Sequence, residues 1–268
     1  MTTAIVTLTT DFGLSDEYVG ALKGVLLSFL NSLTIIDISH TIPPQDILHA
    51  SMVLAHSVPF YPQGTIHLAV VDPGVGSSRR IVAISAGGQL LVGPDNGLFT
   101  PFLRDGETLV YHVTNEELFR KPVSPTFHGR DIMAPVAAQL AGGMDLSLVG
   151  QRIPRESCIH LSGFASRRIG GTIIGQVIAK DHFGNLRTNI TENEVRNLPG
   201  SGGITLRAGE LQIDGLISVY AERQSGELIA LIDSQGLVEI AVVDGDAAAY
   251  TGIGAGGEII ISRQRRVF

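Results

Sequence analysis

The apolar run from Ile66 to Val71 has the length of a buried strand, and it stops abruptly at the sequence Asp-Pro-Gly-Val-Gly of residues 72–76. Proline fixes one backbone dihedral, and glycine permits turns or a close ligand approach that a side chain would block. The strand is therefore expected to deliver Asp72 at its carboxyl end, where open α/β sheets hold their ligands. Two arginines follow at residues 79–80. A plain tight turn with two solvated arginines would give the same pattern.

A strand followed by a helix recurs through the first half of the chain. Short apolar runs over residues 4–8 and 34–38 each precede a segment with apolar residues at helical spacing. The first helix is expected after Ser15, an N-cap residue, with Asp16 and Glu17 at its positive end. Alternating strands and helices predict an α/β fold in which helices flank a mainly parallel sheet.

The second half of the chain has a different pattern, with short apolar runs broken by glycine. The strands expected there cover residues 172–179, 204–206, 228–232, 237–243 and 258–262. Few helical periods are visible, which is typical of a small β sandwich or barrel. We therefore predict an N-terminal α/β catalytic domain over residues 1–160 and a smaller β-barrel-like C-terminal domain over residues 170–268.

Composition and charge narrow the class of protein. Of the 268 residues, 44% are hydrophobic and 17% charged, which favours a large core over disorder. A net charge of −7 argues against a nucleic-acid or anionic-membrane partner. The single cysteine, Cys158, excludes an internal disulfide framework and a cysteine-based zinc site. No apolar stretch approaches the roughly 18 residues of a membrane span, so a cytoplasmic protein is expected.

A second polar segment stands before a predicted helix. Residues 126–131 read Thr-Phe-His-Gly-Arg-Asp, and a helix is expected over residues 132–141. Asp131 has the place of a helix cap, and His128 stands just before it. Because the positive end of a helix is an unusual place for a core histidine, His128 and Asp72 together favour a functional site.

Six segments, in order along nearly the whole chain, resemble one enzyme family. They are Thr10-Asp11-Phe12-Gly13, Asp37-Ile38-Ser39-His40, Val71-Asp72-Pro73-Gly74-Val75-Gly76, Gly93-Pro94-Asp95-Asn96-Gly97, Thr126-Phe127-His128-Gly129-Arg130-Asp131 and Phe183-Gly184-Asn185. The family is the adenosine-forming S-adenosylmethionine hydrolases, also called S-adenosylmethionine hydroxide adenosyltransferases, which are related to the fluorinase and chlorinase enzymes. The resemblance implies a homotrimer that needs no cofactor or metal and takes S-adenosylmethionine as its substrate. It also implies that the ligand lies between the N-terminal domain of one subunit and the C-terminal domain of the next.

The resemblance also implies roles for individual residues. The hydrolytic trio of the family falls on Asp72, Arg79 and His128, with Arg80 as the alternative arginine. The implied substrate contacts are Asp11 to the ribose hydroxyls, Asp16 and Asp181 to the methionine amino group, Ser234 near the methionine carboxylate, and Phe183, Asn185 and Tyr220 around the adenine. Gln235 stands where the halogenases have an arginine against the carboxylate.

These residues suit hydrolysis. A sulfonium leaves as neutral methionine, so the reaction needs only an oxygen nucleophile held in line with the ribose C5′. Asp72 and His128 are expected to accept hydrogen bonds from that water, and Arg79 to favour its hydroxide form.

Three alternatives stay open at this point. A chlorinase-like halogenase would displace methionine with halide, although Asp72 would repel the anion. A binding module would sense S-adenosylmethionine or adenosine without turnover, but binding alone does not need the trio. A metal hydrolase would use Asp11, Asp37, His40 and Asp72, which lack a familiar ligand spacing.

Overall fold

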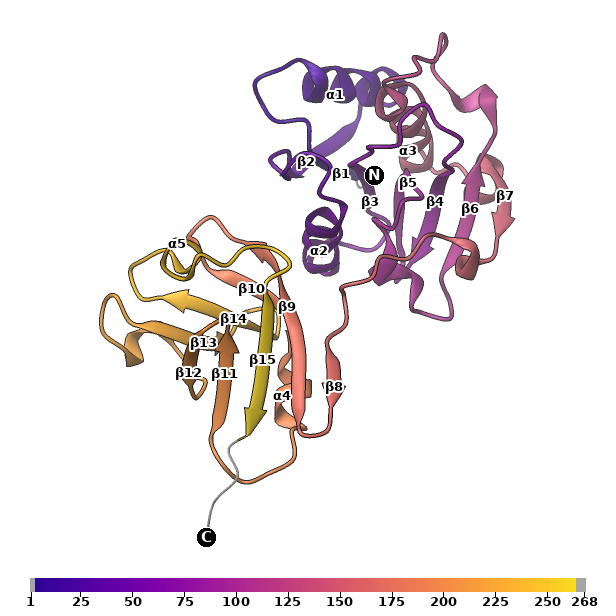
Figure 1. Cartoon of the computed structure of the whole chain (residues 1–268). Coiled ribbons are helices and arrows are strands. Elements are labelled where there is room, and N and C mark those ends of the chain that lie inside the picture. The colour runs from indigo at the N-terminus through magenta and orange to yellow at the C-terminus, as the bar shows by residue number, and fades with distance from the viewer. Residues whose placement is uncertain (1–2, 264–268) are drawn as a thin grey trace. The chain divides into compact units, whose positions relative to one another are not determined.

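The computed structural model describes residues 3–263, and the chain divides into two compact units (Figure 1). The first unit is Met1–Leu161 and the second is Ser162–Phe268. Each unit has its own sheet and its own hydrophobic core. Within residues 3–263, no helix is both long enough and apolar enough to cross a lipid bilayer.

The first unit is built on a seven-stranded sheet with the order β2-β1-β3-β5-β4-β6-β7. The strands are β1 (Ala4–Thr10), β2 (Leu33–Ser39), β3 (Ile66–Val70), β4 (Ile81–Ala86), β5 (Gln89–Pro94), β6 (Leu109–Val113) and β7 (Gly150–Ile153). The predicted α/β class is confirmed. The parallel pairs are confined to β2, β1, β3 and β5, and the remaining pairs are antiparallel.

A tight hairpin explains why β4 and β5 run antiparallel. The two strands are joined by Gly87 and Gly88, which both have positive φ, at 57° and 78°. A two-residue loop with two left-handed residues joins antiparallel strands, whereas parallel strands need a long crossover. The parallel pattern therefore ends where these glycines occur.

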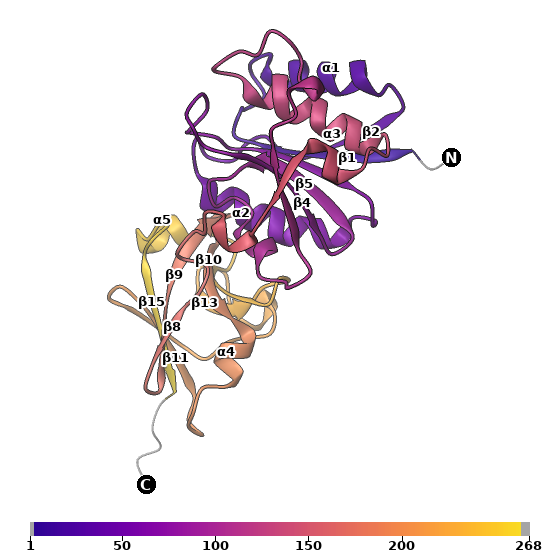
Figure 2. The ribbon, with the colours of Figure 1, turned by 90° about the vertical axis from the view of Figure 1, so that its right-hand side faces the viewer.

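Three helices cover the two faces of this sheet. They are α1 (Tyr18–Phe29), α2 (Ile47–Ser57) and α3 (Ala134–Ala141). Helices α1 and α3 lie together on one face and α2 lies on the other (Figure 2). Because both faces are covered, the central strand β3 has no exposed residue, as its apolar sequence predicted.

The one polar residue of β3, His67, is fully buried with partners on both ring nitrogens. Its Nδ1 lies 2.7 Å from the hydroxyl of Thr7, and its Nε2 meets the side-chain oxygen of Gln89. Gln89 in turn donates to the carbonyls of Val58 and Tyr61. His67 is therefore a paired core histidine that joins neighbouring strands to the end of α2.

Two predicted helix starts are wrong. Helix α1 begins at Tyr18 with Glu17 as its N-cap residue, and not at Ser15. The loop before it is instead tied to the end of β2, because the N–H of Gly13 donates to the carbonyl of His40. Asp131 is not a helix cap either. It lies inside a π-helical turn, Gly129–Met133, that leads into α3, and its side chain is fully buried.

The second unit is an eight-stranded sheet with the order β12-β11-β15-β9-β10-β14-β13, in which β8 pairs with β9. Its strands are β8 (Arg167–Ile169), β9 (Thr172–Lys180), β10 (Leu186–Thr191), β11 (Ile204–Ala208), β12 (Leu211–Asp214), β13 (Leu228–Ile232), β14 (Leu237–Val242) and β15 (Glu258–Arg263). Two short helices, α4 (Glu192–Arg196) and α5 (Ala247–Thr251), accompany it. A bridge between Ile217 and Leu231 brings the chain after β12 to the opposite edge strand, which nearly closes the sheet into the predicted barrel.

Strand β10 is not among the strands that the sequence predicted. Its polar side chains Thr188 and Asn189 are buried because they have specific partners. The hydroxyl of Thr188 donates to the carbonyl of Val238, and Asn189 joins the N–H of Gln176 to the carbonyl of Gly163. A strand with buried polar residues lacks the alternating apolar pattern that predicts a strand, so it could not be predicted from periodicity.

Candidate active site

Asp72 lies just past the carboxyl end of β3, where its backbone is held from the neighbouring strand. The side chain of Asn96, which follows β5, donates to the carbonyl of Val71 at 2.8 Å. After Asp72 the chain makes a compact turn, in which the N–H groups of Val75 and Ser77 donate to the carbonyls of Asp72 and Gly74. The carboxylate is therefore presented from a rigid support.

Arg79 follows that turn, and two nitrogens of its guanidinium donate hydrogen bonds to Asp72. Its Nε donates to Oδ1 of Asp72 at 2.6 Å, and its Nη2 donates to Oδ2. The two side chains are only 9% and 6% exposed. A paired, two-point contact of this kind is among the strongest side-chain interactions, because both groups are charged and their planes match.

Arg80 pairs with a different carboxylate, and its role is structural. Its Nε donates to Oδ2 of Asp95 at 2.8 Å, and the other carboxylate oxygen of Asp95 accepts the N–H of Ile159. Arg80 and Asp95 thus tie the segment after β7 to the sheet. The geometry therefore pairs Asp72 with Arg79, the arginine that the family resemblance favoured.

His128, which is distant in the sequence, contacts the pair of Asp72 and Arg79. Its Nδ1 lies 3.1 Å from Nη2 of Arg79. An arginine only donates hydrogen bonds, so Nδ1 must be the acceptor, and the neutral ring then carries its proton on Nε2. Burial and the charge of Arg79 lower the pKa of His128, against smaller opposing effects of Asp72 and Asp131. The imidazole is accordingly neutral at pH 7.

A cavity of about 270 Å³ opens beside these groups. It is lined by Asp11, Phe12, Gln45, Val70, Asp72, Pro73, Val75, Thr126, Phe127, His128 and Gly129. Oδ2 of Asp11 accepts the N–H of Gln45 at 2.8 Å, which leaves Oδ1 for another partner. Gln45 has a left-handed backbone with φ 66°, a strained conformation that often accompanies functional sites.

Asp16 lies apart from the other predicted residues of this unit. A second cavity, of about 570 Å³, shares Asp11, Phe12 and Phe127 with the first and adds Glu17, Tyr18 and Arg130. The rings of Phe12, Tyr18 and Phe127 meet one another with centroids 5.5 to 5.9 Å apart. Asp16 lines neither cavity and is exposed in the loop before α1.

In the second unit the three residues expected around adenine do come together. Phe183, Asn185 and Tyr220 line one cavity of about 650 Å³, with the segment Val242 to Gly245. Phe183 is 76% exposed, so a large aromatic face is open to a ligand.

Asp181 organises the turn that carries two of these residues. Its Oδ1 accepts the N–H groups of Phe183 and Asn185, each at 2.9 Å, and its Oδ2 accepts the side-chain amide of Asn185 at 3.2 Å. The residue between them, Gly184, has φ 88°, and a Cβ there would lie in the side chain of Asp246.

Ser234 lies in the turn between β13 and β14 and is exposed. The same turn is held by Asp233, whose Oδ1 accepts the N–H groups of Gln235 and Leu237. Ser234 is not among the residues that line the cavity of Phe183, Asn185 and Tyr220.

The metal-hydrolase alternative gains no support from the geometry. Within residues 3–263, no three His, Cys, Asp or Glu side chains are grouped so that they could hold a metal ion. His40 is instead engaged by Thr10, whose hydroxyl lies 2.8 Å from its Nδ1, and by Asp37 at 3.0 Å.

Comparison with known proteins identifies the relatives of this chain. Residues 6–150 match the N-terminal domain of the SAM hydroxide adenosyltransferase family and residues 175–260 match its C-terminal domain. The chain belongs to the SAM hydroxide adenosyltransferase family. An (R)-S-adenosyl-L-methionine hydrolase from Salinispora tropica is 38% identical, over 96% of this chain and 97% of that protein. A fluorinase from Actinoplanes sp. is 27% identical, over 88% of this chain and 90% of that protein.

A solved structure supports the same relationship. The crystal structure of an uncharacterised conserved protein from Thermotoga maritima superposes with a TM-score of 0.88 at 36% identity. That alignment covers 97% of this chain and all of the other. The chain therefore shares its fold with the Thermotoga protein over nearly its whole length.

Two residues around these cavities, Gln45 and Glu239, were not predicted from the sequence, and a third residue, Asp131, has a role other than the helix cap expected for it. Gln45 lines the first cavity, Asp131 organises the segment before His128, and Glu239 is 3% exposed and accepts the hydroxyl of Tyr220 at 2.5 Å. Burial, and more weakly the charges of Asp181 and Asp233, raise the pKa of Glu239, whereas the hydrogen bond from Tyr220 lowers it. Only Glu239 left a signal, because it is a lone carboxylate within an otherwise apolar strand.

The different partners of the two arginines predict different effects on His128. In Arg79→Met the pKa of His128 should rise, because a cation 3.1 Å from its ring is removed. Arg80→Met is the matched control and should leave that pKa unchanged, since Arg80 pairs with Asp95. NMR titration of the histidine ring signals in both variants measures this. Equal shifts in the two variants would contradict the pairing.

Proposed function

We propose that this protein hydrolyses S-adenosyl-L-methionine to adenosine and L-methionine, by attack of water or hydroxide at the ribose C5′. The observation that carries the proposal is the contact of Asp72, Arg79 and His128 beside a cavity of about 270 Å³. Relatives that are named (R)-S-adenosyl-L-methionine hydrolase, and that align along almost the whole chain, support it.

We propose that the trio holds the attacking oxygen. Arg79 occupies one lone pair on each oxygen of Asp72, and the remaining lone pairs are free to accept a hydrogen bond from water. His128 already accepts from Arg79 at Nδ1, so toward water it acts as a donor through Nε2. This differs from the sequence-based expectation that His128 accepts from water. One acceptor and one donor fix both the position and the orientation of the oxygen.

The chemistry fits this arrangement. The methionine sulfur leaves as a neutral thioether, so no acid is needed to protonate it, and no cofactor is required. As the oxygen bonds to C5′, the C5′–S bond breaks and its electron pair leaves on the sulfur. Attacking water gives one proton to Asp72 and keeps the other as the 5′ hydroxyl, whereas hydroxide gives up none, and the charge of Arg79 favours the hydroxide form. Asp72 disfavours a bound halide in the same place, which makes a halogenase the weaker candidate.

We assign substrate contacts to the remaining predicted residues. Asp11 has one oxygen left for the ribose hydroxyls, and Phe183, Asn185 and Tyr220 line a cavity wide enough for adenine. Asp16 and Asp181 are proposed to meet the methionine amino group and Ser234 its carboxylate. The support for these last three contacts is the family resemblance. A cytoplasmic location stays a prediction.

The source of the oxygen tests the reaction directly. In water enriched in oxygen-18, the purified protein should convert S-adenosylmethionine to adenosine that carries the label at its 5′ hydroxyl. Mass spectrometry of the product measures this. Unlabelled adenosine, or 5′-chloro-5′-deoxyadenosine formed in chloride buffer, would contradict hydrolysis, and tight binding without any product would favour the binding module.

Three substitutions separate chemistry from binding. Asp72→Ala and His128→Ala should each lower turnover by about two to four orders of magnitude, the range expected for a positioned proton-transfer group. Their affinity for S-adenosylmethionine, measured by calorimetry, should change little. Asp11→Ala should instead weaken binding strongly, because the carboxylate proposed to hold the ribose is lost. Equal losses of affinity in all three variants would refute this division.

We further propose a homotrimer in which each site combines the first unit of one subunit with the second unit of its neighbour. His128 lines a cavity of the first unit and Asn185 a cavity of the second. When His128→Ala and Asn185→Ala chains are unfolded and refolded together, some sites of the mixed trimers should contain both native residues. Activity should then exceed that of either parent. If mixed trimers form but stay inactive, each site lies within one subunit.

A further inference from the structure

The segment that carries His128 into the site has no regular secondary structure. Residues 119–127 lie between a short 3₁₀ turn, Glu116–Leu118, and the π-helical turn that begins at Gly129. No strand pairing and no helix therefore fixes this segment. Its position depends on individual side-chain and backbone contacts, and His128 follows it directly.

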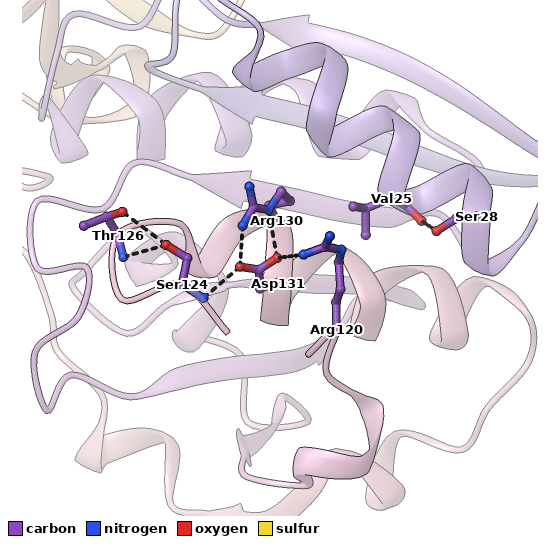
Figure 3. A network of polar contacts seen from close by, with 7 residues as sticks. All are labelled: Val25, Ser28, Arg120, Ser124, Thr126, Arg130 and Asp131. Carbon is purple, nitrogen blue, oxygen red and sulfur yellow. Dashed lines mark hydrogen bonds and ion pairs between the residues drawn. The ribbon is translucent and has the colours of Figure 1, made fainter. Parts of the chain in front are cut away.

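One carboxylate collects most of those contacts. Asp131 is fully buried, and its Oδ2 accepts the backbone N–H of Ser124 at 2.9 Å (Figure 3). Arg130 donates to both carboxylate oxygens, at 2.8 and 2.7 Å. Arg120 donates to Oδ1 at 3.0 Å through its side chain, and its backbone N–H donates to the carbonyl of Asp131 at 2.9 Å. Asp131 thus joins the start and the middle of the segment to the helical turn.

Phe127, at the end of the segment, is held by Arg130 and by the backbone of the helical turn that contains Asp131. The guanidinium of Arg130 lies 4.9 Å from the centre of the Phe127 ring, and the carbonyl of Phe127 accepts the N–H groups of Arg130 and Asp131. Phe127 precedes His128 directly. A shift of Arg130 would therefore be passed to the histidine through its neighbour.

The loop that carries Arg79 packs against residues 119–127. Gly76 has φ 79°, and a Cβ at this position would lie 2.5 Å from the carbonyl oxygen of Pro125. Only glycine permits this approach. The His128 segment and the Asp72–Arg79 loop are therefore packed against each other, and a displacement of one must disturb the other.

Two cations surround this single buried carboxylate. Burial raises the pKa of Asp131, but the hydrogen bonds from Arg130, Ser124 and Arg120 outweigh it and hold the pKa below its usual value. The side chain is thus a carboxylate at neutral pH. Each hydrogen-bond partner of the carboxylate is a donor, so no neutral side chain could replace all of these contacts.

We propose that Asp131 is a positioning residue of the reaction, which holds residues 119–127 so that Nδ1 of His128 meets Arg79. The inference rests on the proposed function only for the role of His128 in the chemistry. The placement of the histidine is independent of the substrate and can be tested without it.

Asp131→Asn keeps the shape of the side chain, but it removes the charge and turns an NH₂ group toward a donor. We expect kcat to fall about 10- to 100-fold, because small misplacements of a catalytic group have effects of this size, while KM changes less than about threefold. Leu140→Ala in α3 is the control. Leu140 is buried in the same core but forms no hydrogen bond to residues 119–127, so it reports the effect of lower stability.

The titration of His128 provides a readout that does not need turnover. The charged groups around its ring are Arg79, Asp72 and Asp131, with Asp11 and Arg130 nearby. Asp131 by itself raises the pKa of His128, so loss of its charge alone would lower that pKa. Loss of the contact with Arg79, whose charge lowers the pKa more strongly, should instead raise the pKa of His128 in Asp131→Asn. The acidic limb of the pH–rate profile should move in the same direction, and Leu140→Ala should move neither.

Arg120→Met supplies a second variant that keeps the carboxylate. The side chain of Arg120 is 45% exposed, so the variant should fold. It loses only the contact between the Arg120 guanidinium and Asp131 at the start of the segment. A kcat loss of about three- to tenfold is expected.

The positioning role is overturned if Asp131→Asn, shown to be folded, retains kcat within twofold of wild type. It is also overturned if its loss of kcat equals that of Leu140→Ala at equal melting temperature and the pKa of His128 is unchanged or lower. Should wild type form no adenosine, the proposed function fails, whereas the His128 titration still decides the positioning role.

Discussion

The contact on which the candidate site depends is the buried two-point ion pair between Asp72 and Arg79. A carboxylate and a guanidinium that are 6% and 9% exposed lose most of their hydration, and only close pairing offsets that cost. Because Arg79 uses Nε and Nη2 on Asp72, its orientation is fixed, and the same Nη2 reaches Nδ1 of His128. The ion pair therefore fixes which ring nitrogen of His128 carries the proton and how the ring is oriented.

The fold supports this pair from three directions. Strand β3 is buried on both faces and ends just before Asp72, and Asn96 holds the backbone at Val71. The turn after Asp72 packs through Gly76 against Pro125, which belongs to the segment before His128. That segment is anchored in turn by Asp131. The candidate site is thus an assembly of loops, but each loop is tied to its neighbours by specific contacts.

Much of this could be read from the sequence, and the failures have physical causes. The long apolar run of β3 and the exact limits of β13 (Leu228–Ile232) follow from periodicity and length. Strand β10 was missed because Thr188 and Asn189 are buried with partners far away in the sequence. Asp131 has the sequence position of a helix cap, but its partners Arg120 and Ser124 cannot be inferred from local pattern. This site is built by polar contacts between residues far apart in the sequence, and such contacts leave no periodic signal.

The most direct test of the central claim, that Asp72, Arg79 and His128 hold the attacking oxygen, is a crystal structure of the complex with adenosine. The 5′ oxygen of the product should lie within hydrogen-bond reach of a carboxylate oxygen of Asp72 and of Nε2 of His128, at roughly 2.6 to 3.2 Å from each. The pair between Asp72 and Arg79 should be unchanged. A bound adenosine whose 5′ oxygen contacts neither residue would contradict the assignment of the nucleophile site.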